Sequence, residues 1–513
     1  MTARRWIIVG IASLLLVLAV AATLLIANWP FTEAAVAKAL QDRFARSVKL
    51  GAFHRTYFPP GFIAQDVQFL HRKRQDLPPL ITVQTISVRA SYSGLLRIHQ
   101  RLNTVQIAGL HVIIPPKSPG ETKQVFPLTT SVSGKNLAIG EIATDDAVLE
   151  FMPRERGADP FVLKIDHLVL DHVGESDPLT FHARFNNTEP PGEIRSDGQF
   201  GPWDDNDPAA TTVSGAYTYQ HVNLAAFEGI SGTLSSVGNF SGTLGQIDGE
   251  GTIDIPDFKV TDSSHSVHVL STYQAVIDGT NGDTHLARVE SHLGRTTVLS
   301  QGDVKSQSGA HGKTVNLAMN VTQGRVEDLL RLFTGSAQPA ENGAVRLRVK
   351  ANLPPGPLSF LRRLRLDGDF GIGAAHFTDP KIQLPINRLA ESAAGEKKDQ
   401  EEVDPATVLS DLKGHLSAKG GIVQLSNISF TEPGTLAQLA GTYDLVTKSV
   451  NLKGVLTTNG KLADTTSGFK SLVLKALTPF IKKKSLTVVP FTVSGTSSDP
   501  SFALDLLGKR HPR

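Results

Sequence analysis

The sequence predicts a mainly β protein, an elongated and curled antiparallel β-groove with an N-terminal transmembrane helix and a few short amphipathic helices. The chain has 513 residues, which is too many for one compact core. Its 45 glycines and 29 prolines accompany an apolar fraction of 40%, a balance typical of turn-rich β proteins and too apolar for disorder. Beyond residue 50, apolar and polar residues alternate, as in strands that bury one face.

Composition excludes several classes of function. The 51 Lys and Arg residues nearly balance the 49 Asp and Glu residues, so the net charge is only +2. Without a basic excess to displace counterions from phosphates, nucleic acid is not an expected partner. The chain has no cysteine, which excludes disulfides, thiolate zinc sites and cysteine nucleophiles.

Residues 6–27 predict a membrane anchor. Ile7–Ala27 contains no charged residue and thirteen Leu, Ile or Val residues, which favour insertion by about 4 to 8 kcal/mol. Arg4 and Arg5 precede it, so we expect residues 1–5 in the cytoplasm and the body in the periplasm. A cleavable signal peptide is the alternative, although its apolar region is usually shorter.

Residues 28–50 predict an amphipathic helix. Thr32 is a suitable N-cap, and Val36, Leu40 and Phe44 recur every four residues. Two interpretations stay open. The helix lies on the membrane or guards an entrance, or it packs against the first strands.

Strand patterns dominate the body, which we divide into a periplasmic β-groove at 51–390, a charged disordered loop at 391–405 and a C-terminal β region at 406–513. Alternation predicts half-buried antiparallel strands rather than parallel crossover strands, including the segment that carries Val105, Ile107, Leu110, Val112 and Ile114. The apolar positions that we expect to line the groove are Val315, Leu317, Met319, Val321, Val345, Leu347, Val349, Leu364, Leu366, Val450 and Leu452.

Two further amphipathic helices interrupt this pattern. Arg325–Phe333 has apolar residues at helical spacing. Residues 469–480 form a second apolar stripe beside a run of lysines, which predicts a terminal helix that touches acidic lipids or caps the sheet.

Catalytic signatures are weak throughout the chain. Gly312-Lys313-Thr314 resembles the end of a phosphate-binding loop, but the required earlier glycine is Gln307 and a strand follows. His265 and His268 are three apart in a strand-like stretch, so they face opposite sides. We interpret Asp145 and Asp146 as polar loop residues. The chain is therefore not expected to be an enzyme, and no catalytic residue, metal site or cofactor is predicted.

A sheet with one apolar face must cover that face or curl around an apolar ligand. Too few helices are predicted to cover the strands. A lipid is the natural occupant, because moving a two-chain lipid through water exposes about 30 methylenes at about 0.8 kcal/mol each.

Several motifs resemble the AsmA family. They are Phe53–Phe62 and Ile107–Val112 near the start, Ile255–Phe258 and the Gly324–Phe333 helix in the middle, and Leu439–Leu445, Val489–Thr496 and Asp499–Phe502 near the end. Each is weak alone, and their order along nearly the whole chain carries the resemblance.

The resemblance implies an inner-membrane anchor and a periplasmic β-groove related to bridge-like, chorein-type lipid transfer proteins. The expected function is to hold or conduct phospholipids for outer-membrane lipid homeostasis. The alternative is a non-catalytic envelope assembly factor with a protein partner that affects outer-membrane protein biogenesis.

Overall fold

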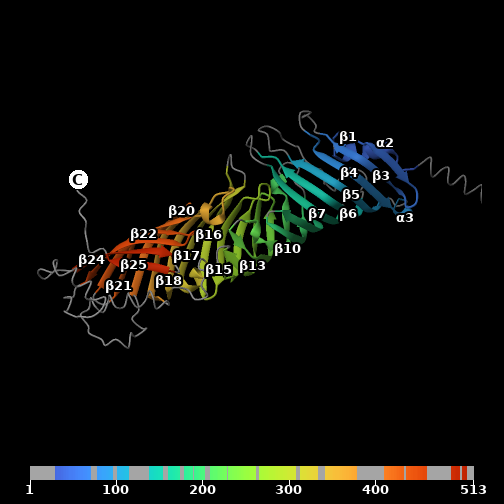
Figure 1. Cartoon of the computed structure of the whole chain (residues 1–513). Coiled ribbons are helices and arrows are strands. Elements are labelled where there is room, and N and C mark those ends of the chain that lie inside the picture. The colour runs from blue at the N-terminus through green and yellow to red at the C-terminus, as the bar shows by residue number, and fades with distance from the viewer. Residues whose placement is uncertain are drawn as a thin grey trace, which may run out of the picture. The chain divides into compact units, whose positions relative to one another are not determined.

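The computed structural model describes residues 29–504 except 45, 71–77, 96–100, 115–137, 154–159, 174–177, 189, 203–207, 228, 261–264, 308–311, 333–340, 378–409, 433–434, 459–486 and 497–498 (Figure 1). The predicted anchor at 6–27, the charged loop at 391–405 and the terminal helix at 469–480 lie outside these residues. No helix of the described part is long and apolar enough to cross a membrane.

The fold is mainly β, and the described residues divide into two compact units. The first holds the described residues up to 153 together with Pro160–Phe185 and Ser196–Val213. The second holds Asn186–Arg195 and the residues from Ser214 onward. The elements that begin before Ser214 are α2 (Glu33–Phe44), β1 (Val48–Lys49), β2 (Ala52–Thr56), β3 (Gly61–Phe69), β4 (Ile81–Ala90), α3 (Tyr92–Leu95), β5 (Arg101–Ile114), β6 (Ala138–Phe151), β7 (Phe161–Val173), β8 (Leu179–Thr188), β9 (Pro191–Phe200), η1 (Pro208–Ala210) and β10 (Thr212–Asn223).

The elements from residue 224 onward all belong to the second unit. They are η2 (Leu224–Ala226), β11 (Ile230–Ser231), β12 (Thr233–Thr243), β13 (Gln246–Val260), β14 (Val267–Ile277), β15 (Thr284–Leu293), β16 (Thr296–Ser306), β17 (Lys313–Arg325), α4 (Val326–Leu330), β18 (Glu341–Leu353), α5 (Phe360–Arg363), β19 (Arg365–Phe377), β20 (Ser410–Lys419), β21 (Ile422–Glu432), β22 (Thr435–Asp444), β23 (Ser449–Thr458), β24 (Thr487–Thr496) and β25 (Asp499–Leu504).

Helix α2 belongs to the core of the first unit. The Thr32 hydroxyl accepts a hydrogen bond from the Ala35 amide at 3.3 Å, as an N-cap does. Val36 is buried beside Trp29 and Phe31 in a cluster that continues through β3, β4 and β5. Of the two interpretations left open for residues 28–50, the structure has the helix packed against the first strands.

One strand pair of the first unit is parallel, which corrects the prediction of antiparallel strands throughout. Residues of β5 such as Val105 and Val112 pair in parallel with Ile142 and Leu149 of β6. A parallel partner requires a crossover of a dozen or more residues, and residues 115–137 separate these two strands. Alternation alone does not report the direction of a neighbouring strand.

Asp145 and Asp146 lie within β6 rather than in the predicted loop. Asp145 pairs across the strands with His167, with 2.6 Å between its Oδ1 and His167 Nδ1. Asp146 is skipped in the pairing and has a positive φ of 54°. The strand therefore accommodates the second aspartate in a left-handed backbone conformation without a change of register, and Asp tolerates that conformation better than most residues.

The second unit is an antiparallel ladder in which consecutive strands pair from β12 to β25 (Figure 1). Strand β19 pairs with β20 from Leu366–Ala418 to Ile372–Leu412. The sheet therefore continues across the predicted division at 391–405, because that segment is an insertion between two paired strands.

The sheet is curled. Strand β11 pairs with the last residues of β13, and α5 connects the end of β18 to the start of β19. These positions lie at opposite edges of the ladder, yet a Cβ built on Gly229, next to β11, would lie 2.9 Å from the Cβ of Phe360. In a flat sheet the strand length alone would hold the two edges about 30 Å or more apart.

Candidate functional site

The candidate site is one face of the second unit, defined by two rows of directly paired residues. Directly paired residues in a sheet have their side chains on the same face. The first row, called the Leu317 row, consists of Phe240, Gly249, Ala275, Leu286, Gly302, Leu317, Ala351, Leu366, Ala418, Val423, Tyr443, Val450 and Gly495.

The second row lies next to it and is called the Met319 row. It consists of Gly238, Gly251, Tyr273, Val289, Ser300, Met319, Val349, Gly368, Leu416, Leu425, Gly441, Leu452 and Val493. Neither row contains a charged residue. We call the surface that the two rows form the apolar face.

The opposite face has the reverse character. Between the two apolar rows runs the Ala318 row, which consists of Gln301, Ala318, Lys350, Asp367, Ser417, Gln424, Thr442, Asn451, Ser494 and Ser501. Ala318 is its one residue without a polar side chain. The alternation seen in single strands is thus kept in register from β16 to β25.

Most large side chains of the apolar face are half-buried. Leu317, Leu366 and Val423 belong to this group, whereas Lys350 and Asp367 on the opposite face are exposed. In the described part of the second unit the helical segments η2, α4 and α5 are too short to form a second layer over the face.

Small residues alternate with large ones on the apolar face. Gly302 lies between Leu286 and Leu317, and Gly441 lies between Leu425 and Leu452. Glycine and alanine at these positions leave room for the neighbouring leucines.

The predicted groove residues fall into three groups. Leu317, Leu366 and Val450 lie in the Leu317 row, and Met319, Val349 and Leu452 lie in the Met319 row. Val315 pairs with Val304 and Leu353. It lies two residues before Leu317 on β17, so its side chain is on the same face. These residues share one face of the sheet, and Val349 among them is buried.

The second group lies beneath helix α4, the short form of the helix predicted over Arg325–Phe333. Val321 and Val345 are fully buried in a cluster with Val326 of α4, and Leu347 packs against them. These residues are covered by protein, so they contribute core packing instead of an open surface.

Leu364 forms the third group and differs from its predicted position. It is the C-cap of α5 and lies before β19 rather than in a strand. The short α5 helix occupies Phe360–Arg363 directly before it. The spacing of Leu364 and Leu366 resembles strand alternation, so the sequence pattern does not reveal this helix. Leu364 is buried.

Helix α4 is attached to the sheet by buried carboxylates. Asp328 Oδ2 accepts hydrogen bonds from the Arg295 amide at 2.9 Å and from the Thr296 hydroxyl at 3.0 Å. Glu327 Oε1 lies 3.1 Å from the Arg295 guanidinium. The turn between β15 and β16 therefore fixes the helix that covers one end of the apolar face.

The polar face carries cross-strand pairs of histidine and aspartate. His285 Nδ1 lies 2.9 Å from Asp303 Oδ1, and His415 Nδ1 lies 2.9 Å from Asp369 Oδ1. The hydrogen bond with Asp369 raises the pKa of His415. Exposed pairs of this kind contribute little energy to stability.

Lys313, part of the motif that resembles a phosphate-binding loop, has a structural role. Its Nζ donates to the Asn281 carbonyl at 2.9 Å and to Asp283 at 3.1 Å. Burial raises the pKa of Asp283, but hydrogen bonds from Ser306 and Lys313 outweigh it and lower the pKa below its ordinary value. The lysine therefore joins the start of β17 to the turn before β15.

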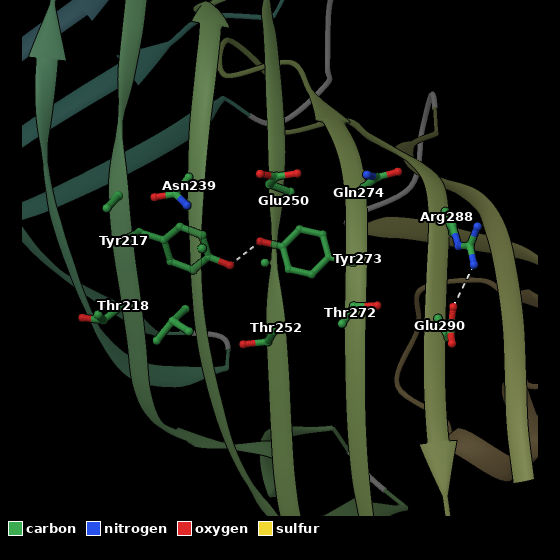
Figure 2. Close-up of a pocket in the computed structure, with 14 residues that line it drawn as sticks. Tyr217, Thr218, Asn239, Glu250, Thr252, Thr272, Tyr273, Gln274, Arg288 and Glu290 are labelled. Atoms are coloured by element: carbon green, nitrogen blue, oxygen red, sulfur yellow. Dashed lines mark hydrogen bonds and ion pairs between the residues drawn. The ribbon is translucent and has the colours of Figure 1, made fainter.

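A cluster of hydroxyl groups interrupts the hydrocarbon of the apolar face near β10 to β14, and sequence reasoning did not identify it. The rings of Tyr217 and Tyr273 point toward one another, and their hydroxyls are hydrogen bonded (Figure 2). The Tyr217 hydroxyl also bonds Ser236 Oγ at 2.8 Å, and Ser236 Oγ donates to the Thr252 carbonyl at 2.8 Å. Burial raises the pKa of Tyr273 well above its ordinary value, and the bond with Tyr217 raises it further.

Glycines make room for the Tyr217 ring. A Cβ built on Gly238 would lie 2.7 Å from Cε1 of Tyr217, and one built on Gly251 would lie 3.0 Å from the Tyr217 hydroxyl. The tyrosines and glycines border a cavity of about 800 Å³ that is also lined from the polar face, where Arg288 pairs with Gln274 and Glu290 pairs with Thr272 (Figure 2). The signal in the sequence is a tyrosine within an apolar alternation opposite a Gly-X-Gly strand.

Comparison with known proteins leaves the family open. No family model matches the chain, and no curated protein matches it at a significant level.

Proposed function

We propose that this protein is a membrane-anchored lipid carrier whose β-groove holds or conducts phospholipids between the membranes of a Gram-negative cell envelope. The observation that carries the proposal is the pair of uncharged rows on the apolar face. In the Leu317 row, directly paired residues continue from β12 to β24 without a charged side chain. At about 4.8 Å per strand, this row is about 60 Å long.

The length of the row favours a lipid over a compact ligand. It is about twice the thickness of a bilayer hydrocarbon core, so acyl chains can lie anywhere along it. Passage of a two-chain lipid through water exposes about 30 methylenes, a barrier of about 24 kcal/mol. A half-buried apolar surface removes most of that barrier, and the polar opposite face keeps the carrier in water.

The remaining parts of the proposal come from the sequence. Residues 6–27 anchor the chain in the inner membrane, with the N-terminus in the cytoplasm and an elongated body in the periplasm. The protein in this proposal is not an enzyme and needs no cofactor, because lipid movement along the groove breaks no bond. Its role belongs to envelope biogenesis and lipid homeostasis of the outer membrane, as the resemblance to the AsmA family implies.

Site-specific photocross-linking in cells tests the proposal. A photoreactive amino acid replaces Leu317 or Leu366 on the apolar face, and Ala318 or Asp367 on the polar face serves as the matched control. We expect phospholipid adducts from the first pair and none from the second, detected by mass spectrometry of the purified chain.

Two results would contradict the proposal. Equal lipid adducts from both faces would mean that the apolar face has no special role. Protein adducts at Leu317 and Leu366 without lipid would instead support an envelope assembly factor whose partner covers this face.

A further inference from the structure

We propose that the hydroxyl cluster of Tyr217, Ser236 and Tyr273 is a head-group site that selects lipids whose polar end carries a hydrogen-bond donor. This inference rests on the proposed lipid carrier and specifies where, and by which chemistry, the carrier recognises its lipid. The cluster lies on the apolar face, since Tyr273 pairs with Gly251 and Val289 of the Met319 row.

The direction of the hydrogen bonds follows from counting protons. Ser236 has one hydroxyl proton, and it donates that proton to the Thr252 carbonyl at 2.8 Å. The bond of 2.8 Å between Tyr217 and Ser236 must then use the Tyr217 proton. The bond between the two tyrosines must in turn use the Tyr273 proton. All three protons are engaged within the protein.

A cluster with no free proton can only accept further hydrogen bonds. Each phenol or hydroxyl oxygen has two lone pairs, so the cluster retains acceptor capacity. It suits an ammonium, an amide N–H or a hydroxyl on the ligand and does not suit a bare carbonyl or phosphate oxygen. Because the Tyr273 hydroxyl stays protonated throughout the physiological range, this preference does not change with pH there.

The surroundings match an amphiphile. Both tyrosines are half-buried, so neither side chain is sealed within a core. On the same face Phe240 pairs with Gly249, and Leu286 pairs with Ala275, next to the cluster. Acyl chains that lie along these apolar residues bring the polar end of the lipid to the hydroxyls. A hydrogen bond in such a low-dielectric setting discriminates more strongly than one in water.

Head-group competition tests the inference. The full chain, purified in a non-ionic detergent, is incubated with mixed micelles that contain equal amounts of ethanolamine, glycerol and choline phospholipids with identical acyl chains. The ethanolamine and glycerol head groups carry donors, and the choline head group carries none. We expect the first two to co-purify about 3- to 10-fold more than choline lipid, because a single hydrogen bond discriminates at this level.

Variants separate the cluster from the rest of the groove. Tyr217→Phe with Tyr273→Phe removes both phenol oxygens, and we expect total lipid to stay while the preference falls to about 1. Tyr219→Phe is the matched control on the same strand, since its hydroxyl donates to the Pro190 carbonyl at 2.9 Å and lies outside the cluster. Its preference should equal that of the unaltered protein.

The outcomes distinguish this inference from the proposed function. The unaltered chain could load all three lipids equally, or it could prefer choline lipid through its aromatic rings. Either result would reject the head-group site and leave the proposed lipid carrier unaffected. A preference that survives in the double phenylalanine variant also overturns the site. If lipid loading does not fall when Leu317→Glu and Leu366→Glu are combined, the proposed carrier itself fails.

Discussion

Glycines in the strands of the second unit occupy positions where a side chain has no room. Gly242, near the end of β12, has a φ of 133°, which L-residues rarely adopt. A Cβ built on it would lie 2.3 Å from the Gln246 carbonyl oxygen. The Ser-Gly-Thr sequence at 241–243 also occurs at 231–233, where Gly232 has a φ of 137°, so both glycines adopt a backbone conformation that other residues reach only with strain.

Gly242→Ala should therefore destabilise the second unit. We expect a loss of about 1–3 kcal/mol in unfolding free energy, measured by denaturant titration, because the added methyl group forces the backbone to move. Gly373→Ala is the control, since a Cβ there meets nothing within 4 Å. A Gly242→Ala protein as stable as the control would contradict the steric argument.

At the scale of elements, helix α4 is too short to be stable by itself, and tertiary contacts hold it in place. Five residues provide about one turn, so packing and side-chain hydrogen bonds supply the stability. Val326 enters the buried cluster with Val321 and Val345, and Asp328 bonds the turn at Arg295 and Thr296. The helix therefore follows from the strands beneath it as much as from its own periodicity.

Asp328→Ala should release α4 from the sheet. The substitution leaves the Arg295 amide without its acceptor, and we expect a loss of about 1–3 kcal/mol. Hydrogen exchange at residues 326–330 measures the effect locally and should become faster. Asp248→Ala, at an exposed position of β13, serves as the control. Unchanged exchange at α4 would show that its apolar contacts suffice.

At the scale of the whole molecule, function depends on the rows remaining uncharged across many strands. A single charge on the apolar face blocks the row, because an acyl chain next to an ion leaves that ion without water. The combination of Leu317→Glu with Leu366→Glu places two carboxylates at half-buried positions of the Leu317 row. Leu347 is a less suitable position for such a substitution, because its side chain packs against the buried cluster beneath α4 and a charge there would also disturb the core.

We expect this double variant to retain its fold and to lose at least about 10-fold in lipid loading, measured by lipid co-purification. Sensitivity of the cell envelope to detergent should rise in parallel. Ala318→Glu adds a charge to the polar face of β17, next to Leu317, and should change neither the lipid loading nor the detergent sensitivity. A double variant that loads lipid normally would remove the main support for transport along the face.

Much of the architecture follows from local pattern. The period of two in Val315–Val321 and Val345–Val349 predicts one-faced strands, and their rows lie on one face as expected. The cap at Thr32 and the helix near Val326 are also visible in the sequence. Leu364 shows the limit of this reasoning, because a short helix next to a strand imitates the alternation of the strand itself.

The sequence by itself determined that the chain is mainly β and that each strand has an apolar and a polar side, since side-chain alternation is a property of the extended backbone. Only the tertiary structure decided which strands are neighbours, that β5 and β6 run in parallel, and that Tyr217 meets Tyr273 across two intervening strands. These features depend on contacts between residues far apart in the chain. Register aligns apolar sides into continuous rows, and no local pattern specifies that alignment.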